Sequence, residues 1–311
     1  MGLIFMGTPQ FASPSLKAIM ESGEEIKAIV SQPDRPQGRG RKVELSPIKR
    51  LALEYKVLLL QPSKIRNSLV IEQIKSLNPE FIIVVAYGQR LPKEILSLPV
   101  HGCINLHASL LPRYRGAAPI QWAIINGEVK SGVTTMLMNE EMDKGGILLQ
   151  EEVVIDPNDT AQSLHDKLAG RGAELLIRTL EGMRKGNLVP RPQDERLATY
   201  APKMTKDQGR INWAKQADEV RNLVRGVTPW PGAYTYHKKV LLKVWKVELA
   251  EGKEEGQPGE VIGLSEQGIL VATGKGRVVL TEVQPESGKR MNANEYRRGH
   301  LIQKGDLLGL T

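Results

Sequence analysis

The sequence contains very little cysteine. Cys103 is the only one among 311 residues, so no disulfide can form within the chain. Its neighbours in the stretch CINLH are mostly apolar, and a cysteine in such a stretch is far more often a packed thiol than a nucleophile. Catalysis by a thiol is therefore disfavoured.

Long hydrophobic runs are also absent. No apolar stretch approaches the roughly 18 residues that a helix needs to span a bilayer. The first residues, MGLIFMGTPQ, have no basic region ahead of a long apolar stretch, which a secretory signal would have. Met6 stands where a myristoylation signal requires Ser or Thr. We therefore expect a soluble cytoplasmic protein that does not associate with membranes.

The usual motifs for nucleotides and metals are missing too. The chain has no G-x-x-x-x-G-K-[ST] sequence, and the first apolar run enters MGTPQFASPS, with one glycine where a dinucleotide fingerprint has three. The five histidines show neither H-E-x-x-H nor a Cys/His spacing typical of metal sites. We therefore predict no metal and no nucleotide cofactor, which argues against a Rossmann oxidoreductase.

Positive charge is in excess, and half of the excess lies in one segment. Lysine and arginine number 43 against 35 acidic residues, a formal net charge of +8. Residues 33–50, PDRPQGRGRKVELSPIKR, hold six cations and two acidic residues. The first part is rich in proline and glycine and lacks periodicity, which predicts an exposed, mobile loop. Such a loop suits a polyanionic partner, although an ordinary solvated surface segment would explain the charges as well.

Short apolar runs alternate with amphipathic stretches of helical length in the first half of the chain. The runs read as buried strands at residues 3–6, 26–31, 57–61, 81–88, 103–107 and 134–138. The amphipathic stretches cover residues 11–21, 46–55, 66–77 and 119–126. This alternation predicts an α/β fold, with a mostly parallel Rossmann-like sheet and helices on both of its faces.

The composition changes after residue 185. A helix with its own start signal is predicted over 159–185, followed by a proline-rich and charged stretch with little periodicity. Beyond it, apolar runs separated by glycine-containing turns predict a small C-terminal β-barrel of the OB type. We therefore divide the chain into a catalytic domain (1–188), a linker (189–205) and a barrel domain (206–311).

Two polar side chains interrupt the apolar run 103–107. Side chains on a strand alternate between the two faces of a sheet, so Asn105 and His107 project to the same side and Leu106 to the other. A lone histidine is more often structural than catalytic. An amide and an imidazole together at the end of a strand instead indicate a functional site.

Asp143 supplies a third polar group for this site. It lies in the turn-forming NEEMDKGG that follows the apolar run 134–138. If that run lies parallel and close to 103–107, an amide, an imidazole and a carboxylate meet at the carboxyl edge of the sheet. Such a trio suits acyl transfer, because the amide can donate to an oxyanion while the carboxylate orients the imidazole. No serine or cysteine sits in an activating motif, so the attacking group must belong to the substrate.

The stretch around these residues is long and specific. CINLHASLLPRYRGAAPIQWAI, with MDKGG, resembles the signature of the formyltransferases that use 10-formyltetrahydrofolate. The resemblance extends to FMGTPQFA, SQPDRPQGRG, VVAYGQRLP and GVTPWPGAY, and it covers nearly the whole chain. One departure is visible, because the family usually has glycine and threonine where this chain has Glu141 and Lys144.

The resemblance implies a role for particular residues. The catalytic trio of the family corresponds to Asn105, His107 and Asp143. Its folate-contacting S-L-L-P stretch corresponds to Ser109, Leu110, Leu111 and Pro112. Its basic tRNA-binding loop corresponds to Arg35, Arg39, Arg41 and Lys42, with Arg39 wedged near the first base pair of the acceptor arm.

The resemblance also implies the reaction. The free α-amine of methionine on a charged initiator tRNA would attack the formyl carbon of 10-formyltetrahydrofolate, which serves as co-substrate. The barrel would bind along the acceptor arm of the tRNA, and we expect the enzyme to be a monomer that needs neither metal nor nucleotide.

Three other functions stay open at this point. A glycinamide ribonucleotide formyltransferase shares the trio but needs neither the second domain nor the basic loop. A 10-formyltetrahydrofolate hydrolase could share both domains. A non-catalytic RNA-binding protein would explain the charge and the barrel, but it leaves the polar trio without a role.

Overall fold

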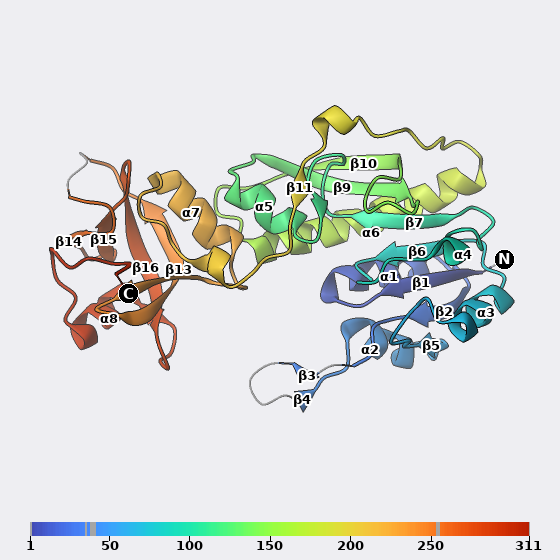
Figure 1. The fold of residues 1–311 in the computed structure, drawn as a ribbon, viewed down its shortest axis with the longest axis horizontal. Helices are drawn as coiled ribbons and strands as arrows, with labels where there is room; N and C mark the ends of the chain where they lie inside the picture. The colour runs from blue at the N-terminus through green and yellow to red at the C-terminus, as the bar shows by residue number, and fades with distance from the viewer. Residues whose placement is uncertain (1, 35, 38–41, 253–255, 311) are drawn as a thin grey trace. The chain divides into compact units, whose positions relative to one another are not determined.

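The chain folds into two compact units (Figure 1). The computed structural model describes residues 2–34, 36–37, 42–252 and 256–310. The N-terminal unit contains Met1–Gly116, Ser131–Val154 and His165–Ala201, and the C-terminal unit contains Ala117–Lys130, Ile155–Leu164 and Pro202–Thr311. Each unit is therefore built from three separate stretches of the sequence.

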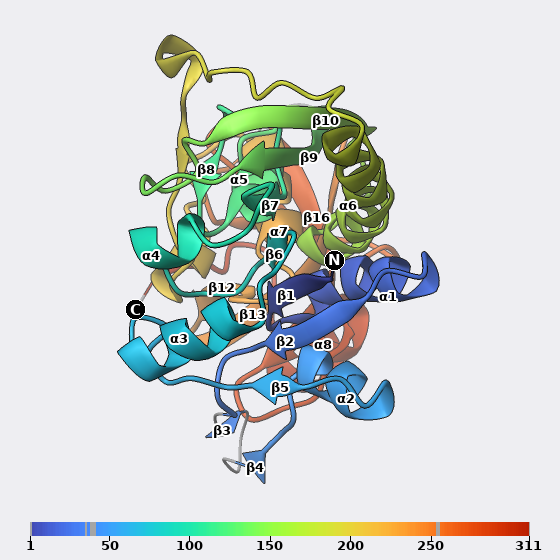
Figure 2. The same ribbon diagram turned by 90° about the vertical axis from the view of Figure 1, so that its right-hand side faces the viewer.

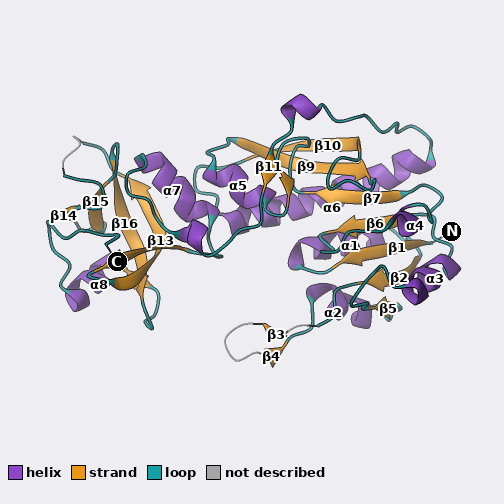
Figure 3. Cartoon of the chain, viewed as in Figure 1, coloured by secondary structure: helices purple, strands orange, loops and turns teal. Residues whose placement is uncertain are grey.

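A seven-stranded sheet forms the centre of the N-terminal unit (Figure 3). In order across the sheet its strands are β10 (Gly146–Val154), β9 (Lys130–Leu137), β7 (Cys103–His107), β6 (Ile82–Val85), β1 (Leu3–Gly7), β2 (Ile26–Val30) and β5 (Leu59–Leu60). The pairs β1–β2, β1–β6, β2–β5 and β6–β7 are parallel. The mostly parallel sheet predicted from the apolar runs is confirmed.

Helices cover both faces of this sheet, as predicted. Figure 2 shows α1, α2 and α6 on one side of the strands, and α3 and α4 on the other. Their bounds are α1 (Ser13–Glu21), α2 (Pro47–Glu54), α3 (Ser68–Ser76), α4 (Lys93–Leu96) and α6 (Ala161–Arg184). Side-chain caps start two of them, because Ser46 accepts from the Lys49 amide and Asn67 from the Leu69 amide. The core between helices and sheet is apolar, with Cys103 packed among aliphatic residues.

Cys103 is 1% exposed, and burial raises the pKa of its thiol to about 12. A thiol with such a pKa is protonated at neutral pH and makes a poor nucleophile. The expectation of a packed thiol is therefore confirmed.

No helix of the described chain is both long and apolar enough to cross a membrane.

The pairing of β9 differs from the prediction. This strand runs antiparallel to β7, with Ile104 opposite Leu137 and His107 opposite Thr134. A parallel neighbour needs a crossover that returns the chain across the sheet. The segment between β7 and β9 instead contains the short helix α5 (Pro119–Ile125), which belongs to the C-terminal unit. The end of β9 therefore lies beside the start of β7, away from His107.

The C-terminal unit contains a sheet of antiparallel strands in the order β12, β13, β16, β15, β14, with β17 added to β16. Their bounds are β12 (Ala233–His237), β13 (Val240–Leu249), β14 (Val261–Leu264), β15 (Ile269–Ala272), β16 (Arg277–Pro285) and β17 (Met291–Asn292). The last residues bond to both edge strands, through Val261 N to Asp306 O and Gly309 N to Tyr236 O, each 2.8 Å. The sheet thereby closes into the predicted barrel.

The C-terminal unit also contains the helices α5, α7 (Ala217–Gly226) and α8 (Ala293–His300). A capping box starts α7, with Gln216 and Glu219 each bonding the other's backbone amide. Gly226 ends this helix where α5 passes close by, and an added Cβ there would lie 2.7 Å from Ile125 Cγ1. Helix α5 is therefore fixed against α7.

An ion-pair cluster ties the end of α6 to the N-terminal unit. Arg184 donates from Nε to Glu80 at 2.7 Å and from Nη2 to Glu24 at 2.6 Å. The side chain of Glu24 is 18% exposed and that of Glu80 is 11% exposed. The hydrogen bonds from Arg184 lower the pKa of Glu80 below its ordinary value of 4.5.

We expect the Arg184→Met variant to lose about 1–3 kcal/mol of unfolding free energy, because two largely buried carboxylates lose their partner. Since the folded pKa of Glu80 is lowered, this stabilisation is complete above pH 4.5 and is lost as the pH falls through the folded pKa. Urea unfolding at pH 7.5 and at a pH below the folded pKa of Glu80 measures the difference. Arg178→Met is the control, since Arg178 on the same helix is 58% exposed. An equal loss in both variants would contradict the prediction.

Candidate active site

Asn105 has its amide orientation fixed by the neighbouring strand. Its Nδ2 donates to the Val84 carbonyl of β6 at 3.1 Å. A carbonyl cannot donate, so Nδ2 must face Val84 and Oδ1 must point elsewhere. Oδ1 is buried and has no hydrogen-bond partner among the described residues. The strand end therefore presents an acceptor without a partner, together with the second hydrogen of Nδ2.

His107 projects to the same face as Asn105, while the intervening Leu106 is 2% exposed. The imidazole Nε2 lies 3.0 Å from the Tyr114 carbonyl oxygen. Because that oxygen only accepts, Nε2 carries a hydrogen in both the neutral and the charged ring. Nδ1 is then the nitrogen that gains or loses a proton, and it lies 3.9 Å from Asp143 Oδ1.

Asp143 reaches the histidine from the loop 138–145, which returns from the far end of β9. Its Oδ2 accepts from the Gly116 amide at 2.8 Å, and its side chain is 15% exposed. The 3.9 Å between Oδ1 and His107 Nδ1 is an ion-pair distance, too long for a direct hydrogen bond. The expected meeting of amide, imidazole and carboxylate is seen, but through a returning loop instead of two parallel strand ends.

The backbone of Tyr114 and Gly116 takes part in this arrangement, and sequence reasoning missed both groups. Every residue has these main-chain groups, so the sequence does not mark them. Only the requirement for glycine at position 116 could have been noticed in the sequence. Gly116 has φ +120°, and an added Cβ would lie 2.6 Å from the Ala201 carbonyl oxygen. It belongs to β8 (Arg115–Gly116), which pairs in parallel with β11 (Tyr200–Ala201). The glycine therefore lets the two short strands approach.

The S-L-L-P turn lies next to this site in the sequence and is rigidly held. Ser109 is 1% exposed, and its hydroxyl donates to the Arg113 carbonyl at 2.6 Å. The Leu111 amide donates to Thr134 Oγ1 at 3.1 Å. Leu110 and Pro112 are partly exposed and line a cavity of about 470 Å³. Of the four residues, these two have exposed side-chain surface, whereas Ser109 and Leu111 are buried.

The basic segment is described only in part. Arg35, Arg39 and Arg41 lie outside the described residues, and Lys42 is described only as the start of β4 (Lys42–Val43), which pairs with β3 (Pro36–Gln37). In the described part, Asp34 forms an ion pair with Lys49. The hydrogen bond from Lys49 lowers the pKa of Asp34. These two charges therefore neutralise each other.

Among the described residues, no group of three or more His, Cys, Asp or Glu side chains is arranged to hold a metal ion. The trio contributes one imidazole, one carboxylate and one amide. Its hydrogen bonds run to protein backbone, at Val84, Tyr114 and Gly116. An imidazole beside a carboxylate can transfer protons, and an amide hydrogen can donate to an oxyanion.

Known proteins with similar structures share this architecture. HypX from Aquifex aeolicus, solved with tetrahydrofolic acid, is 19% identical with a TM-score of 0.63, covering 100% of this chain and 51% of that chain. An N-formyltransferase from Helicobacter canadensis, solved with folinic acid and dTDP-3-aminofucose, is 19% identical with a TM-score of 0.68, covering 90% and 98%. At these identities the likeness shows a common fold.

Sequence comparison is more specific. Residues 1–180 match the formyl transferase family, and residues 203–301 match its C-terminal domain. A methionyl-tRNA formyltransferase of Thermodesulfovibrio yellowstonii is 51% identical, covering 98% of this chain and 97% of that protein. One of Caldanaerobacter subterraneus subsp. tengcongensis is 49% identical, covering 99% and 100%. The chain therefore belongs to the methionyl-tRNA formyltransferases, a family of formyl-transferring enzymes.

Proposed function

We propose that this enzyme transfers the formyl group of 10-formyltetrahydrofolate to the free α-amine of methionine on initiator tRNA. The product, N-formylmethionyl-tRNA, serves translation initiation. The observation that carries the proposal is the convergence of Asn105, His107 and Asp143 in a chain about half identical to methionyl-tRNA formyltransferases. No metal or nucleotide has a step in this reaction, because the bound folate supplies the formyl group in activated form.

Asn105 is assigned to the reacting formyl group and the amine. The second hydrogen on Nδ2 can donate to the oxygen that becomes negative when the amine adds to the formyl carbon. The buried Oδ1, without a partner among the described residues, can accept from the amine N–H. A buried acceptor without a partner costs stability, and a substrate donor would remove that cost. Asn105 thus offers a donor to the formyl oxygen and an acceptor to the amine.

His107 is assigned to proton transfer. With Nε2–H bonded to Tyr114 O, only Nδ1 can hold the transferable proton. Asp143 faces that atom and stabilises the charged imidazole. A water between Nδ1 and the carboxylate could carry the amine proton toward the departing folate nitrogen. The amine attacks in its neutral form, because only that form has a free electron pair. The α-amino pKa lies near 7.7–8.0 in model compounds, so part of the amine is neutral near physiological pH.

The remaining assignments concern the two substrates. We assign folate contacts to the S-L-L-P turn, Ser109 to Pro112, chiefly through the partly exposed Leu110 and Pro112. We assign tRNA contacts to Arg35, Arg39, Arg41 and Lys42 and to the barrel domain, residues 206–311, beyond a linker at 189–205. The enzyme is expected to act as a monomer in the cytoplasm, on the acceptor arm of the charged initiator tRNA.

The identity of the acceptor tests the proposed function directly. With 10-formyltetrahydrofolate as donor, we expect formylation of charged initiator tRNA, with much less of a charged elongator tRNA. Glycinamide ribonucleotide should remain unmodified, and little formate should be released to water. The formylated products and formate are quantified by chromatography. Formate release that equals donor consumption would instead identify a folate hydrolase.

Removing members of the trio should affect turnover more than folding. We expect Asn105→Ala and His107→Ala to lower formyl transfer by roughly 10²-fold or more, the usual scale for an oxyanion donor or a general acid/base. The measurement is initial rate at saturating substrates, with near-ultraviolet circular dichroism as a check on folding. His101→Gln, at a histidine outside the site, is the matched control. Near-normal turnover by a folded variant would remove that residue from the mechanism.

The basic loop should make the reaction depend on salt. Each phosphate that the loop neutralises releases counterions. The logarithm of the binding constant therefore falls with the logarithm of the salt concentration, with a slope near −0.9 per phosphate contact on duplex. We expect Arg41→Ala with Lys42→Ala to flatten the dependence of kcat/KM for tRNA on salt concentration. Arg39→Ala should lower kcat/KM for tRNA and leave folate binding unchanged.

The control for this experiment is a pair of exposed lysines of the same unit, Lys75 on α3 and Lys185 just after the end of α6. Lys75→Ala with Lys185→Ala removes two charges that form only local ion pairs. This double variant should keep the salt dependence of the wild-type enzyme. Salt-insensitive turnover by the wild type, or full tRNA activity in the Arg39 variant, would leave the segment as an ordinary solvated surface.

A further inference from the structure

The side chain of Gln193 lies between the linker segment and the loop that carries Asp143. Its Nε2 donates to the Asp143 and Gly145 carbonyls, each at 2.8 Å. Its Oε1 accepts from Arg115 Nε at 3.0 Å and from Nη2 at 2.8 Å. One amide therefore makes four hydrogen bonds, two of them to the backbone of the active-site loop.

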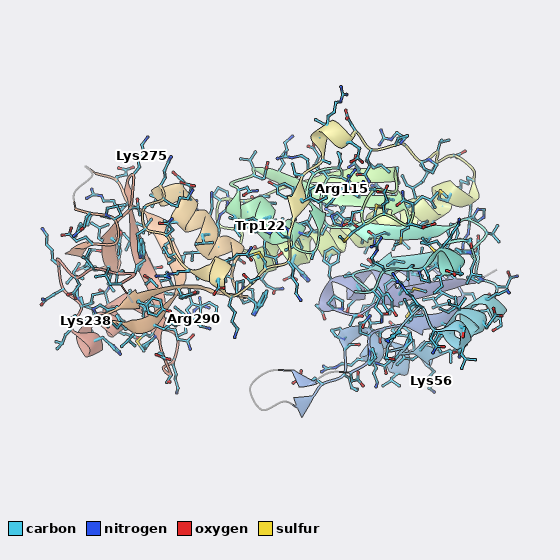
Figure 4. The ribbon with its side chains drawn as sticks, in the orientation of Figure 1. Lys56, Arg115, Trp122, Lys238, Lys275 and Arg290 are labelled. Carbon is cyan, nitrogen blue, oxygen red and sulfur yellow. The ribbon has the colours of Figure 1, made fainter. Side chains whose placement is uncertain are left out.

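Arg115 fixes the direction of that amide. Its side chain, labelled in Figure 4, is 1% exposed and is among the largest fully buried ones. The guanidinium also donates to both carboxylate oxygens of Glu195, at 2.9 and 2.8 Å. This pair raises the pKa of Arg115 and lowers that of Glu195. Because a guanidinium only donates, Gln193 must turn Oε1 toward it and its NH₂ group toward the loop.

The loop needs an outside support of this kind. Asp143 has φ +57°, a left-handed conformation that is uncommon for residues other than glycine. Such a conformation is unfavourable and persists only where the surroundings determine it. Gln193 holds the main chain of Asp143, while the Gly116 amide holds its carboxylate. Asp143 is thus held both at its main chain and at its carboxylate.

The segment that contains Gln193 also holds Tyr114, whose carbonyl bonds His107. Thr199 accepts from the Tyr114 amide through Oγ1 at 2.8 Å, and its carbonyl accepts from the Arg115 amide at 2.9 Å. Tyr114 in turn supplies the carbonyl that His107 Nε2 bonds. Residues 193–199 therefore support both the Asp143 loop and the turn that orients the imidazole.

We propose that Gln193, oriented by Arg115 and Glu195, is a positioning residue for the reaction. It acts through Asp143 by setting where the carboxylate stands relative to His107 Nδ1. A misplacement of about 1 Å in an active site can cost about 10²-fold in rate. This inference rests on the proposed function, which makes Asp143 part of the mechanism.

The central test is a double-mutant cycle between Gln193→Met and Asp143→Asn. Methionine keeps the length of the side chain but can neither donate to the carbonyls nor accept strongly from Arg115. We expect Gln193→Met to lower kcat at least tenfold and to leave the KM for folate and for tRNA within about twofold. In the Asp143→Asn background the same change should cost less than twofold, because the group it positions is already gone.

A second measurement reports on the loop without using activity. The Gly116 amide bonds the Asp143 carboxylate, so hydrogen exchange at Gly116 and over residues 142–147 should become at least tenfold faster in Gln193→Met. Arg196→Met is the matched control. Its side chain is on the same segment, is 88% exposed and bonds Asp194. We expect this variant to match the wild type in both measurements.

The outcomes separate the inference from the proposed function. Unchanged exchange, or an equal loss of kcat in both backgrounds, would overturn the positioning role of Gln193. Faster exchange with full activity in both Gln193→Met and Asp143→Asn would overturn the catalytic role of Asp143, and the inference about the reaction with it. Absence of formyl transfer in the wild type would overturn the proposed function alone, while the exchange result would still show what holds the loop.

Discussion

A backbone carbonyl accepts hydrogen bonds and cannot donate them, and this constraint determines how the site can act. Val84 O turns the Asn105 amide so that Oδ1 is left without a partner among the described residues. Tyr114 O holds a hydrogen on His107 Nε2, so proton exchange is confined to Nδ1. Asparagine and histidine can each donate or accept hydrogen bonds. The two backbone carbonyls determine which atom of each side chain donates and which accepts.

The antiparallel pairing of β9 gives the site its second constraint. Because this strand ends beside the start of β7, the chain must travel back along the sheet before Asp143 can meet His107. Where this loop returns against the sheet, at the half-buried Asp143 and the buried Gly145, its polar backbone groups need partners. The supports are Gly116 N on the carboxylate and the Gln193 amide on the carbonyls.

Much of the fold could be predicted from the sequence, because it depends on local patterns. Apolar runs bounded by glycine or proline indicated the strands, and strand alternation placed Asn105 and His107 on one face. The direction of β9 could not be predicted this way. It depends on where α5 packs, and an amphipathic stretch does not specify which unit it will join. Asp143 was identified correctly as a neighbour of His107, although the route that brings it there is different.

The supporting residues were beyond sequence reasoning for another reason. Residues 189–205 have the prolines, charges and weak periodicity of a linker, and much of this stretch has irregular backbone, as that composition predicts. Irregular backbone can still be rigid where a buried charge requires fixed partners. Arg115 is such a charge, and it draws Glu195 and Gln193 into one arrangement. Composition indicates the local structure that a segment can form by itself. This segment is instead ordered by a guanidinium nearly 80 residues earlier in the chain.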